Sequence, residues 1–198
     1  MSSASEKLVD AAERLFYEQG ISASGVDTIV IASGVSKPTL YAHFHTKTKL
    51  VAAVLERRHQ RRRAALEAHL RARSAQPAAD RLLSLVDWQR TQQSDGSPRG
   101  CPFVNAAVEL VKPEDEGARE VVLRHKRWFR GVLARLAAES GVAEPDALAS
   151  QLHLLIEGVN AIALVEHDLT VMVDAKDAAR ALLAAACHPG NPAHPTRP

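Results

Sequence analysis

Side chains suited to nucleic-acid contacts are concentrated between residues 36 and 49. Lys37 can donate to the O6 and N7 atoms of guanine, and Thr39 can bond a base edge or place its methyl group against that of thymine. The ring of Pro38 can make a minor contact of the same apolar kind. Further polar side chains follow closely, namely Ser36, Tyr41, His43, Lys47 and Lys49. This cluster predicts a surface that binds nucleic acid.

Two short helices around a glycine turn are predicted to carry this segment. Residues 26–33 favour a helix that Ser24 or Gly25 caps, and Gly34 then permits the positive φ of a tight turn. The next helix begins after Ser36, because serine is a good N-cap residue and the following proline lacks only an N–H that the first helical turn does not use. Such a pair forms a helix-turn-helix unit.

The flanking sequence predicts more helix. Residues 5–19 place their apolar side chains on one stripe, and a longer helix is expected from Lys47 to Arg73. Apolar residues of the 37–44 helix should face inward and leave Lys37, Thr39 and His43 outward. Alanine and leucine supply most of the apolar residues, and aromatic residues make up only 4% of the chain. We therefore expect an all-α fold.

Positive charge is concentrated in the N-terminal third. Residues 1–73 contain 12 Lys and Arg against 7 Asp and Glu, whereas the remainder contains 13 against 16. A basic segment suits a phosphate-rich partner, because neutralising phosphates releases counterions. A solvated helical face would give the same balance, so charge alone leaves both interpretations open. The arginine-rich run at 57–63 is better explained as a solvated connector than as an extension of the DNA footprint.

Several stretches resemble the DNA-binding domain of the TetR (tetracycline-repressor-like) family. They are LVDAAERLF at 8–16, GVSKPTLYAHF at 34–44 and KTKL at 47–50, with Ile29 between the first two. The resemblance covers roughly residues 5–55. It implies a homodimer whose third helix enters the major groove of DNA, and a ligand in the C-terminal domain that loosens DNA binding. Two departures from the family pattern are Gly25, where a hydroxyl residue is common, and Val30-Ile31.

The same resemblance assigns phosphate contacts. Tyr41, His43 and Lys47 match family positions that usually touch phosphates, and Lys49 is a weaker candidate of the same sort. The ring of Tyr41 could also pack in the core of the small domain with its hydroxyl at the rim. We expect the helix-turn-helix domain at residues 1–50, an effector-binding and dimerisation domain at 51–188, and a disordered tail at 189–198.

A moderate resemblance marks the start of the effector region. The segment GCPFVNAAVE at 100–109 is similar to one found in a subset of TetR-type regulators, at the start of a helix that lines the effector cavity. Further helices are expected at 78–92 and 116–139, with a loop at 94–100. The candidate effector pocket consists of Trp88, Cys101, Phe103, Asn105, His125, Trp128 and Phe129. Core packing explains each of these residues at least as well. Cys101 could be a redox or electrophile sensor, although a lone buried cysteine is usually inert.

The last two helices are predicted to form a dimer interface. Residues 145–167 carry a wide apolar stripe that includes Leu155 and Ile156, and an alanine-rich helix is expected from Ala175 to Cys187 after an Asp174 cap. Two such helices from each protomer can form a four-helix interface, and the twofold symmetry then suits a palindromic operator. Alternatively, both helices close a monomeric core.

Other classes of protein have little support in the sequence. We find no nucleophile motif, phosphate loop or zinc-protease motif, so no enzymatic activity and no cofactor are expected. His125, His153 and His167 could meet as metal ligands, but satisfied or surface histidines are commoner. No uninterrupted apolar run reaches the ~18 residues that cross a bilayer, which favours a cytoplasmic protein without membrane contact.

Together these features predict a ligand-responsive DNA-binding regulator. The interpretation we favour is a repressor that a small apolar or amphipathic effector releases from a palindromic operator. The alternatives are a DNA-binding regulator without a small-molecule effector, or a metal- or thiol-based sensor.

Overall fold

The structure is a computed structural model that describes residues 3–91, 100–166 and 170–187. In this part of the chain the regular structure is helical, without a β-strand, which confirms the expected all-α fold. The chain divides into two compact units, one of residues 1–64 and 101–125 and one of residues 65–100 and 126–198. Residues 94–99 of the expected loop and the expected tail at 189–198 lie outside the described residues.

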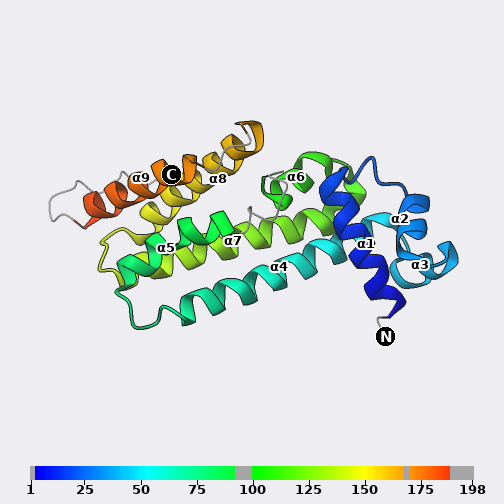
Figure 1. Ribbon diagram of the computed structural model, residues 1–198, viewed down its shortest axis with the longest axis horizontal. Coiled ribbons are helices and arrows are strands. Elements are labelled where there is room, and N and C mark those ends of the chain that lie inside the picture. Colours follow the sequence, from blue (N-terminus) through cyan, green and yellow to red (C-terminus); the bar gives the residue numbers. More distant parts are fainter. Residues whose placement is uncertain (1–2, 92–99, 167–169, 188–198) are drawn as a thin grey trace. The chain divides into compact units, whose positions relative to one another are not determined.

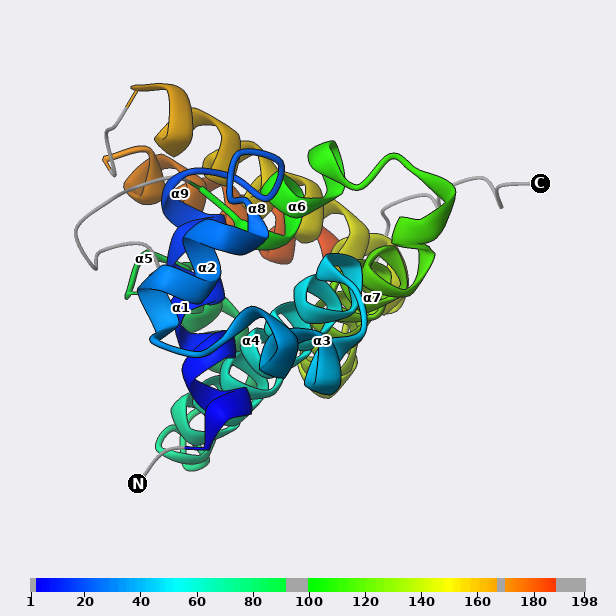
Figure 2. The same ribbon diagram turned by 90° about the vertical axis from the view of Figure 1, so that its right-hand side faces the viewer.

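The first unit contains the predicted helix-turn-helix. Its elements are α1 (Ala4–Glu18), α2 (Val26–Ser33), α3 (Lys37–Phe44), the first part of α4 (Lys47–Arg71), α6 (Pro102–Glu109), the 3₁₀ turn η1 (Pro113–Asp115) and the first part of α7 (Glu116–Glu139). Helices α1, α2 and α3 pack against one another, as both ribbon views show (Figures 1 and 2). The predicted bounds of α2 and α3 agree with the structure.

Local interactions begin and end these helices where the sequence indicates. The Ser3 hydroxyl accepts from the Glu6 amide, while the Glu6 carboxylate accepts from the Ser3 amide, so that α1 starts with a capping box. Gly25 is the N-cap of α2, and Ser24 instead donates its hydroxyl to the carbonyl of Gly20. Gly34 ends α2 with φ +65°, a conformation that costs glycine little.

Two apolar clusters hold the first unit together. One joins α1, α2 and α3 to the start of α4 through buried residues that include Leu8, Ile29, Leu40 and Leu50. The other joins α4, α6 and α7, and consists of Val51, Leu55, Cys101, Phe103, Ala106, Leu110, Ala118, Val121 and Val122. Because α4 contributes to both clusters, it connects the helix-turn-helix to α6.

The second unit is a separate helical core. It contains the end of α4, α5 (Ala78–Thr91), the end of α7, α8 (Pro145–Glu166) and α9 (Val171–Ala186), and α9 packs against both α5 and α8. Its largest fully buried side chains are the leucines Leu66, Leu85, Leu133, Leu136 and Leu148. Ile156 and the partly buried Leu155 belong to this core rather than to an outer face.

Two predicted boundaries are wrong. Helix α9 begins at Val171, one turn before the predicted start at Ala175. Asp174 lies inside its first turn, where a carboxylate stabilises the helix N-terminus much as a cap residue does, which accounts for the error. Helix α4 ends at Arg71 rather than Arg73, and the next four residues form turns.

Helix α8 is long and apolar enough to cross a membrane by length and composition alone. The sequence search for an uninterrupted apolar run missed it, because polar residues interrupt the stretch. Leu148, Leu152, Ile156 and Val159 of this helix are buried in the core of the second unit. A core helix passes the same test of length and composition, so this feature is weak evidence for a membrane span.

Candidate nucleic-acid interface and ligand cleft

Helix α3 presents one polar face outward. Leu40 is fully buried and Val35 is 9% exposed, so they anchor the helix to α1 and α2. Five of the predicted contact residues on the segment are exposed, namely Ser36, Lys37, Pro38, Tyr41 and His43, and so is Lys49 at the start of α4. The ring of Tyr41 is 42% exposed and therefore does not fill the core. Thr39 and Lys47 are half-buried.

Local partners occupy the two predicted base-reading side chains. Lys37 forms an exposed ion pair with Asp27 of α2, with 2.8 Å between Nζ and Oδ1. The hydrogen bond and the charge of Asp27 raise the pKa of Lys37. The hydroxyl of Thr39 lies 2.7 Å from that of Ser36, which also caps the helix. Exposed ion pairs contribute little to stability, so a base edge can replace Asp27 as the partner of Lys37 at a small cost in free energy. Sequence reasoning missed Asp27 as a competing partner.

Lys47 lies in a less expected place. Its ammonium group donates to the carbonyl of Ile21 at 2.5 Å, in the turn between α1 and α2. Burial lowers the pKa of Lys47, and the charge of Lys112 acts in the same direction, while Glu109 opposes it. The proposed phosphate contact therefore requires this side chain to leave the Ile21 carbonyl.

Glu109 of α6 holds the same turn from the other side. Its carboxylate accepts from the amide of Ile21 at 2.9 Å and from that of Ser22 at 2.7 Å. Burial acts to raise the pKa of Glu109, but these two amides, the Ser22 hydroxyl and the charge of Lys47 together lower it. Gly20 has φ +98°, and a Cβ atom there would lie 3.1 Å from the carboxylate. The turn and α6 therefore fit closely, a contact that no sequence pattern indicated.

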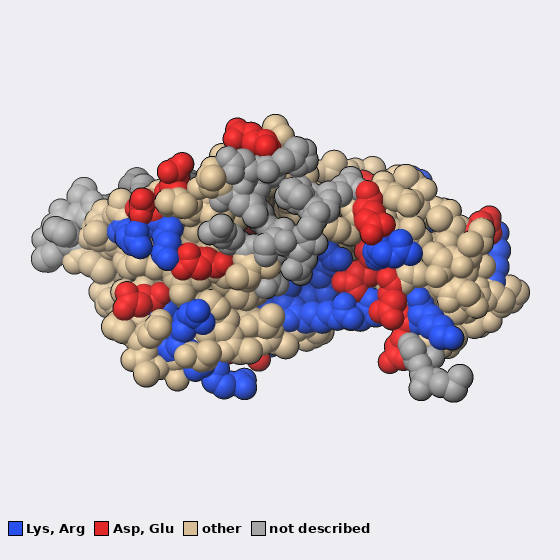
Figure 3. Space-filling view, in the orientation of Figure 1, with Lys and Arg blue, Asp and Glu red and all other residues tan. Residues whose placement is uncertain are grey.

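Arginines of α4 bind acidic residues of α1. Three of them, Arg57, Arg58 and Arg61, contact the carboxylate of Glu13, and Arg57 also contacts Asp10 at 2.6 Å. Figure 3 shows Lys and Arg side chains beside Asp and Glu side chains over this part of α1 and α4. The arginine run is therefore not simply a solvated connector, because it fastens α4 to α1.

The candidate effector residues fall into two groups, one in each compact unit. In the first unit, the ring of the fully buried Phe103 stacks on His125, with 3.6 Å between ring centroids. Cys101 is the N-cap residue of α6 and is 6% exposed. In the second unit, Trp88 and Trp128 each contact the ring of Phe129, at 6.3 and 6.1 Å between centroids.

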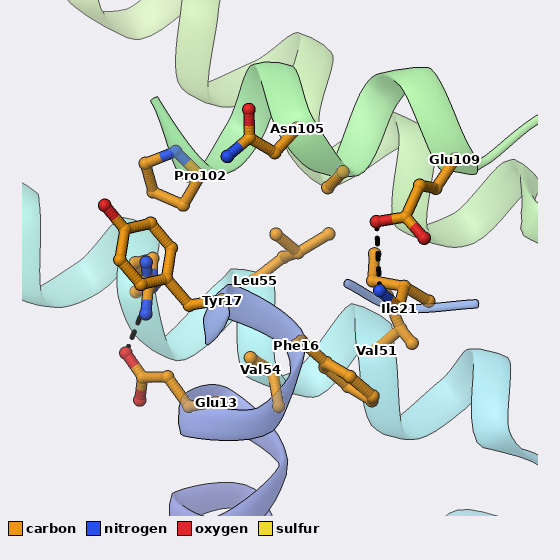
Figure 4. A pocket seen from close by; sticks show the side chains of 12 residues that line it. Glu13, Phe16, Tyr17, Ile21, Val51, Val54, Leu55, Pro102, Asn105 and Glu109 are labelled. Atoms are coloured by element: carbon orange, nitrogen blue, oxygen red, sulfur yellow. Dashed lines mark hydrogen bonds and ion pairs between the residues drawn. The ribbon is translucent and has the colours of Figure 1, made fainter. Parts of the chain in front are cut away.

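A cleft in the first unit lies between α1, α4 and α6. Its volume is about 370 Å³, counting the part that is open to solvent, and Asn105 is the candidate effector residue that lines it (Figure 4). The remaining lining residues are Glu13, Phe16, Tyr17, Ile21, Val51, Val54, Leu55, Arg58, Pro102, Ala106 and Glu109. A second cavity lies in the other unit and has aliphatic walls, including Leu155 and Ile156.

Two histidines form a buried pair. His59 of α4 and His125 of α7 are 2% and 5% exposed, and their Nδ1 atoms are 3.1 Å apart. This distance requires that at least one of the two nitrogens carries no proton. His153, a predicted metal partner of His125, lies in the second unit beside Glu157, and His167 lies outside the described residues. Within the described residues no three candidate ligands meet.

The buried histidine pair should make stability depend on pH. Burial lowers the pKa of His59, with Arg124 and Arg63 acting in the same direction and Glu56 opposing them. The unfolded chain then binds a proton near pH 6.5 that the folded protein does not bind, so stability falls on acidification below that pH. We expect a loss of up to about 1.4 kcal/mol per pH unit from this group. Urea unfolding between pH 7.5 and 5.5 measures it.

A variant that removes the titrating ring provides the control. His59→Asn keeps a hydrogen-bonding side chain opposite His125 but cannot titrate, so its stability should depend less on pH. Burial also lowers the pKa of His69, which therefore contributes in the same direction. The pH dependence of the stability of His69→Asn measures the contribution of His69. If the stability of His59→Asn depended on pH as strongly as that of the unmodified protein, the His59–His125 pair would not contribute to this dependence.

These features define a class of protein. A recognition helix with outward-facing donors, held on a three-helix scaffold, is the arrangement of a helix-turn-helix DNA-binding domain. Residues 8–54 match the family model described as bacterial regulatory proteins, tetR family, and residues 78–179 match that of the tetracyclin repressor-like C-terminal domain. The chain belongs to the TetR family. Members are non-enzymatic transcription factors, and this chain is therefore a DNA-binding transcription regulator.

Individual relatives support this assignment. A solved TetR-family transcriptional regulator from Streptomyces coelicolor is 27% identical, with a TM-score of 0.84 and coverage of 93% of this chain and 96% of the other. The transcriptional repressor ComR of Escherichia coli is 29% identical over 77% of this chain and 75% of its own length. The transcriptional activator FasR of Mycolicibacterium smegmatis is 39% identical over 57% of this chain, but the match spans only 42% of FasR.

Proposed function

We propose that this regulator is a cytoplasmic repressor that binds a palindromic operator as a homodimer and leaves it when a small apolar or amphipathic molecule binds. The observation that carries the DNA-binding part is the outward face of α3, where Lys37, Pro38 and His43 are exposed beside Tyr41. The printed names of the relatives include both a repressor and an activator, so the direction of regulation belongs to the proposal.

Each contact residue has a proposed role. Lys37 and Thr39 read base edges, with Pro38 as a minor apolar contact. Tyr41, His43, Lys47 and Lys49 bind phosphates, and Ser36 caps the helix while it faces the DNA backbone. The dimer forms through the outer faces of α8 and α9. In this proposal residues 1–50 form the DNA-binding domain, and residues 51–188 form the effector-binding and dimerisation domain.

Operator binding tests the assigned roles. Sequencing the genomic DNA that the protein captures supplies the operator, and affinity is then measured on operator and random DNA at several salt concentrations. Lys47→Ala should weaken binding to both DNAs and reduce the salt slope by about one unit. Thr39→Ala should relax specificity at one position of each half-site, at a cost of about 1–3 kcal/mol.

Two further variants separate the groups of Thr39. Thr39→Ser keeps the hydroxyl that contacts Ser36, whereas Thr39→Val keeps only the methyl group. Loss of specificity in one but not the other identifies the group that reads the base. Because Lys47 also holds the Ile21 carbonyl, urea unfolding of Lys47→Ala must show that it remains folded at the assay temperature. Equal effects of Thr39→Ala and Lys47→Ala on operator and random DNA would contradict the assignment.

A further inference from the structure

We propose that Asp27 of α2 determines DNA specificity by restraining Lys37, so that this lysine binds guanine in the operator rather than phosphates of random DNA. This role rests on the proposed binding of an operator and names a residue that makes the protein prefer the operator to other sequences. Asp27 acts across the two helices of the helix-turn-helix, which pack against each other (Figure 1).

The carboxylate of Asp27 and the ammonium group of Lys37 form an ion pair, with 2.8 Å between Oδ1 and Nζ. Asp27 belongs to the first turn of α2, and Lys37 is the first residue of α3. Their side chains are 77% and 49% exposed, so neither is needed to fill the core. The pair therefore joins the starts of the two helices on the outer surface of the helix-turn-helix.

Asp27 is an unusual residue in its stretch of sequence. It is the only acidic residue between positions 19 and 55, a segment that contains three lysines and no arginine. Each lysine that neutralises a phosphate adds affinity for DNA of any sequence. The carboxylate of Asp27 opposes that gain, because it occupies the ammonium group of Lys37 and repels nearby phosphates. Asp27 therefore weakens non-specific binding unless Lys37 finds a better acceptor.

The two partners meet different parts of DNA when this motif docks. The first helix of a helix-turn-helix crosses the phosphate backbone, while the N-terminal residues of the recognition helix reach base edges in the major groove. Asp27 then lies near the backbone, and Lys37 lies near the bases. A phosphate that approaches Lys37 also approaches the carboxylate of Asp27, and the two anions repel each other.

Guanine does not suffer this repulsion, because its O6 and N7 acceptors carry no net charge. An ammonium group has three N–H donors, so Lys37 can bond guanine while one donor stays on Asp27. The ion pair also limits the conformations of the long Lys37 side chain, and less conformational entropy is then lost when it binds a base. Both effects favour guanine over phosphate as the partner of Lys37.

Asp27 also has a structural role that the test must separate from this one. The N-cap residue of α2, Gly25, makes no side-chain hydrogen bond, and the charge of Asp27 in the first turn stabilises the N-terminus of the helix. Loss of that stabilisation alone would affect binding to operator and random DNA alike. The ratio of the two affinities, here called the specificity ratio, therefore isolates the effect on specificity.

Fluorescence anisotropy on the full chain measures the specificity ratio with the captured operator and with random duplex DNA of equal length. Asp27→Asn should lower the ratio about three- to tenfold, mainly by tightening binding to random DNA, because the proposed dimer loses two exposed pairs. Binding of this variant to random DNA should also depend more steeply on salt, since Lys37 takes up a phosphate. Asp27→Glu keeps a carboxylate within reach of Lys37 and should retain most of the ratio.

Two further variants test whether Asp27 acts through Lys37. In a protein that already carries Lys37→Gln, adding Asp27→Asn should change the specificity ratio less than about twofold. Glu18→Gln is the matched control, because it neutralises an exposed acid of α1 that pairs with Arg14 at 3.4 Å. It should leave the specificity ratio unchanged.

An unchanged specificity ratio in Asp27→Asn would overturn the proposal. So would an equal fall in the Lys37→Gln background or in Glu18→Gln, since the acid would then act without Lys37. A fall caused by weaker operator binding at a single base pair would show that Asp27 itself reads cytosine N4, and would overturn it too. If the unmodified protein bound operator and random DNA equally, operator binding itself would be wrong, so the two failures are distinguishable.

Discussion

Replacing Phe103 with alanine is expected to lower the free energy of unfolding by about 3–5 kcal/mol. The ring is fully buried in the cluster of α4, α6 and α7 and stacks on His125, with 9° between the ring planes. Its removal leaves a cavity and deprives the His59–His125 pair of the surface that positions His125.

Urea unfolding measures the loss, and a neighbour on the same helix supplies the control. Val104 follows Phe103 on α6 but is 38% exposed, so Val104→Ala should cost well under half as much. Phe103→Leu retains most of the apolar volume and should be intermediate. If Phe103→Ala and Val104→Ala had similar stabilities, α6 would not be anchored by this ring, and its coupling to the turn held by Glu109 would need another explanation.

The second large effect concerns the proposed homodimer. Leu154→Glu should shift the dimer toward monomers by at least about tenfold in the dissociation constant, because it places a charge in an apolar interface. Leu154 is 72% exposed and Val165 77% exposed on α8, with Gly158 and Ala161 at helical spacing between them. The small residues allow close approach of a second helix, and this stripe faces away from the core of its own unit.

Sedimentation at micromolar concentration and operator affinity provide the two measurements. Monomers lose the second half-site, so operator binding should weaken together with dimerisation. Leu123→Glu makes the same chemical change at a residue 45% exposed on α7 and serves as the control. If the unmodified protein were a monomer, or if Leu154→Glu left the dimer intact, the α8 stripe would not be the interface.

The structure also shows why the residues that the sequence favours are poor positions for this test. Leu155 and Ile156 lie on the apolar stripe of α8, but Ile156 is 4% exposed and both pack in the core of the second unit. Glutamate at either position should therefore unfold the unit rather than only separate the protomers. Helical periodicity identifies the apolar residues of α8, but it does not distinguish those that face their own core from those that face a partner.

The sequence alone predicted the features that depend on neighbours within one or two helical turns. The bounds of α2 and α3, the Ser36 cap, the Gly34 turn and the burial of Leu40 all follow from such local rules. The combination of these elements also identified the family. The misplaced start of α9 shows the limit of such rules, because an acidic residue suits the first turn as well as the cap.

Only the tertiary structure decided the partners of charged and aromatic side chains. Lys47 bonds a carbonyl 26 residues away, and Glu109 bonds an amide 88 residues away, so neither contact leaves a pattern along the chain. The arginines of α4 meet Glu13 for the same reason. The seven candidate effector residues divide between two units, because helices α4 and α7 each run from one unit into the other. Spacing along a helix specifies the face on which a side chain lies, whereas the element that packs against that face depends on the fold of the whole unit.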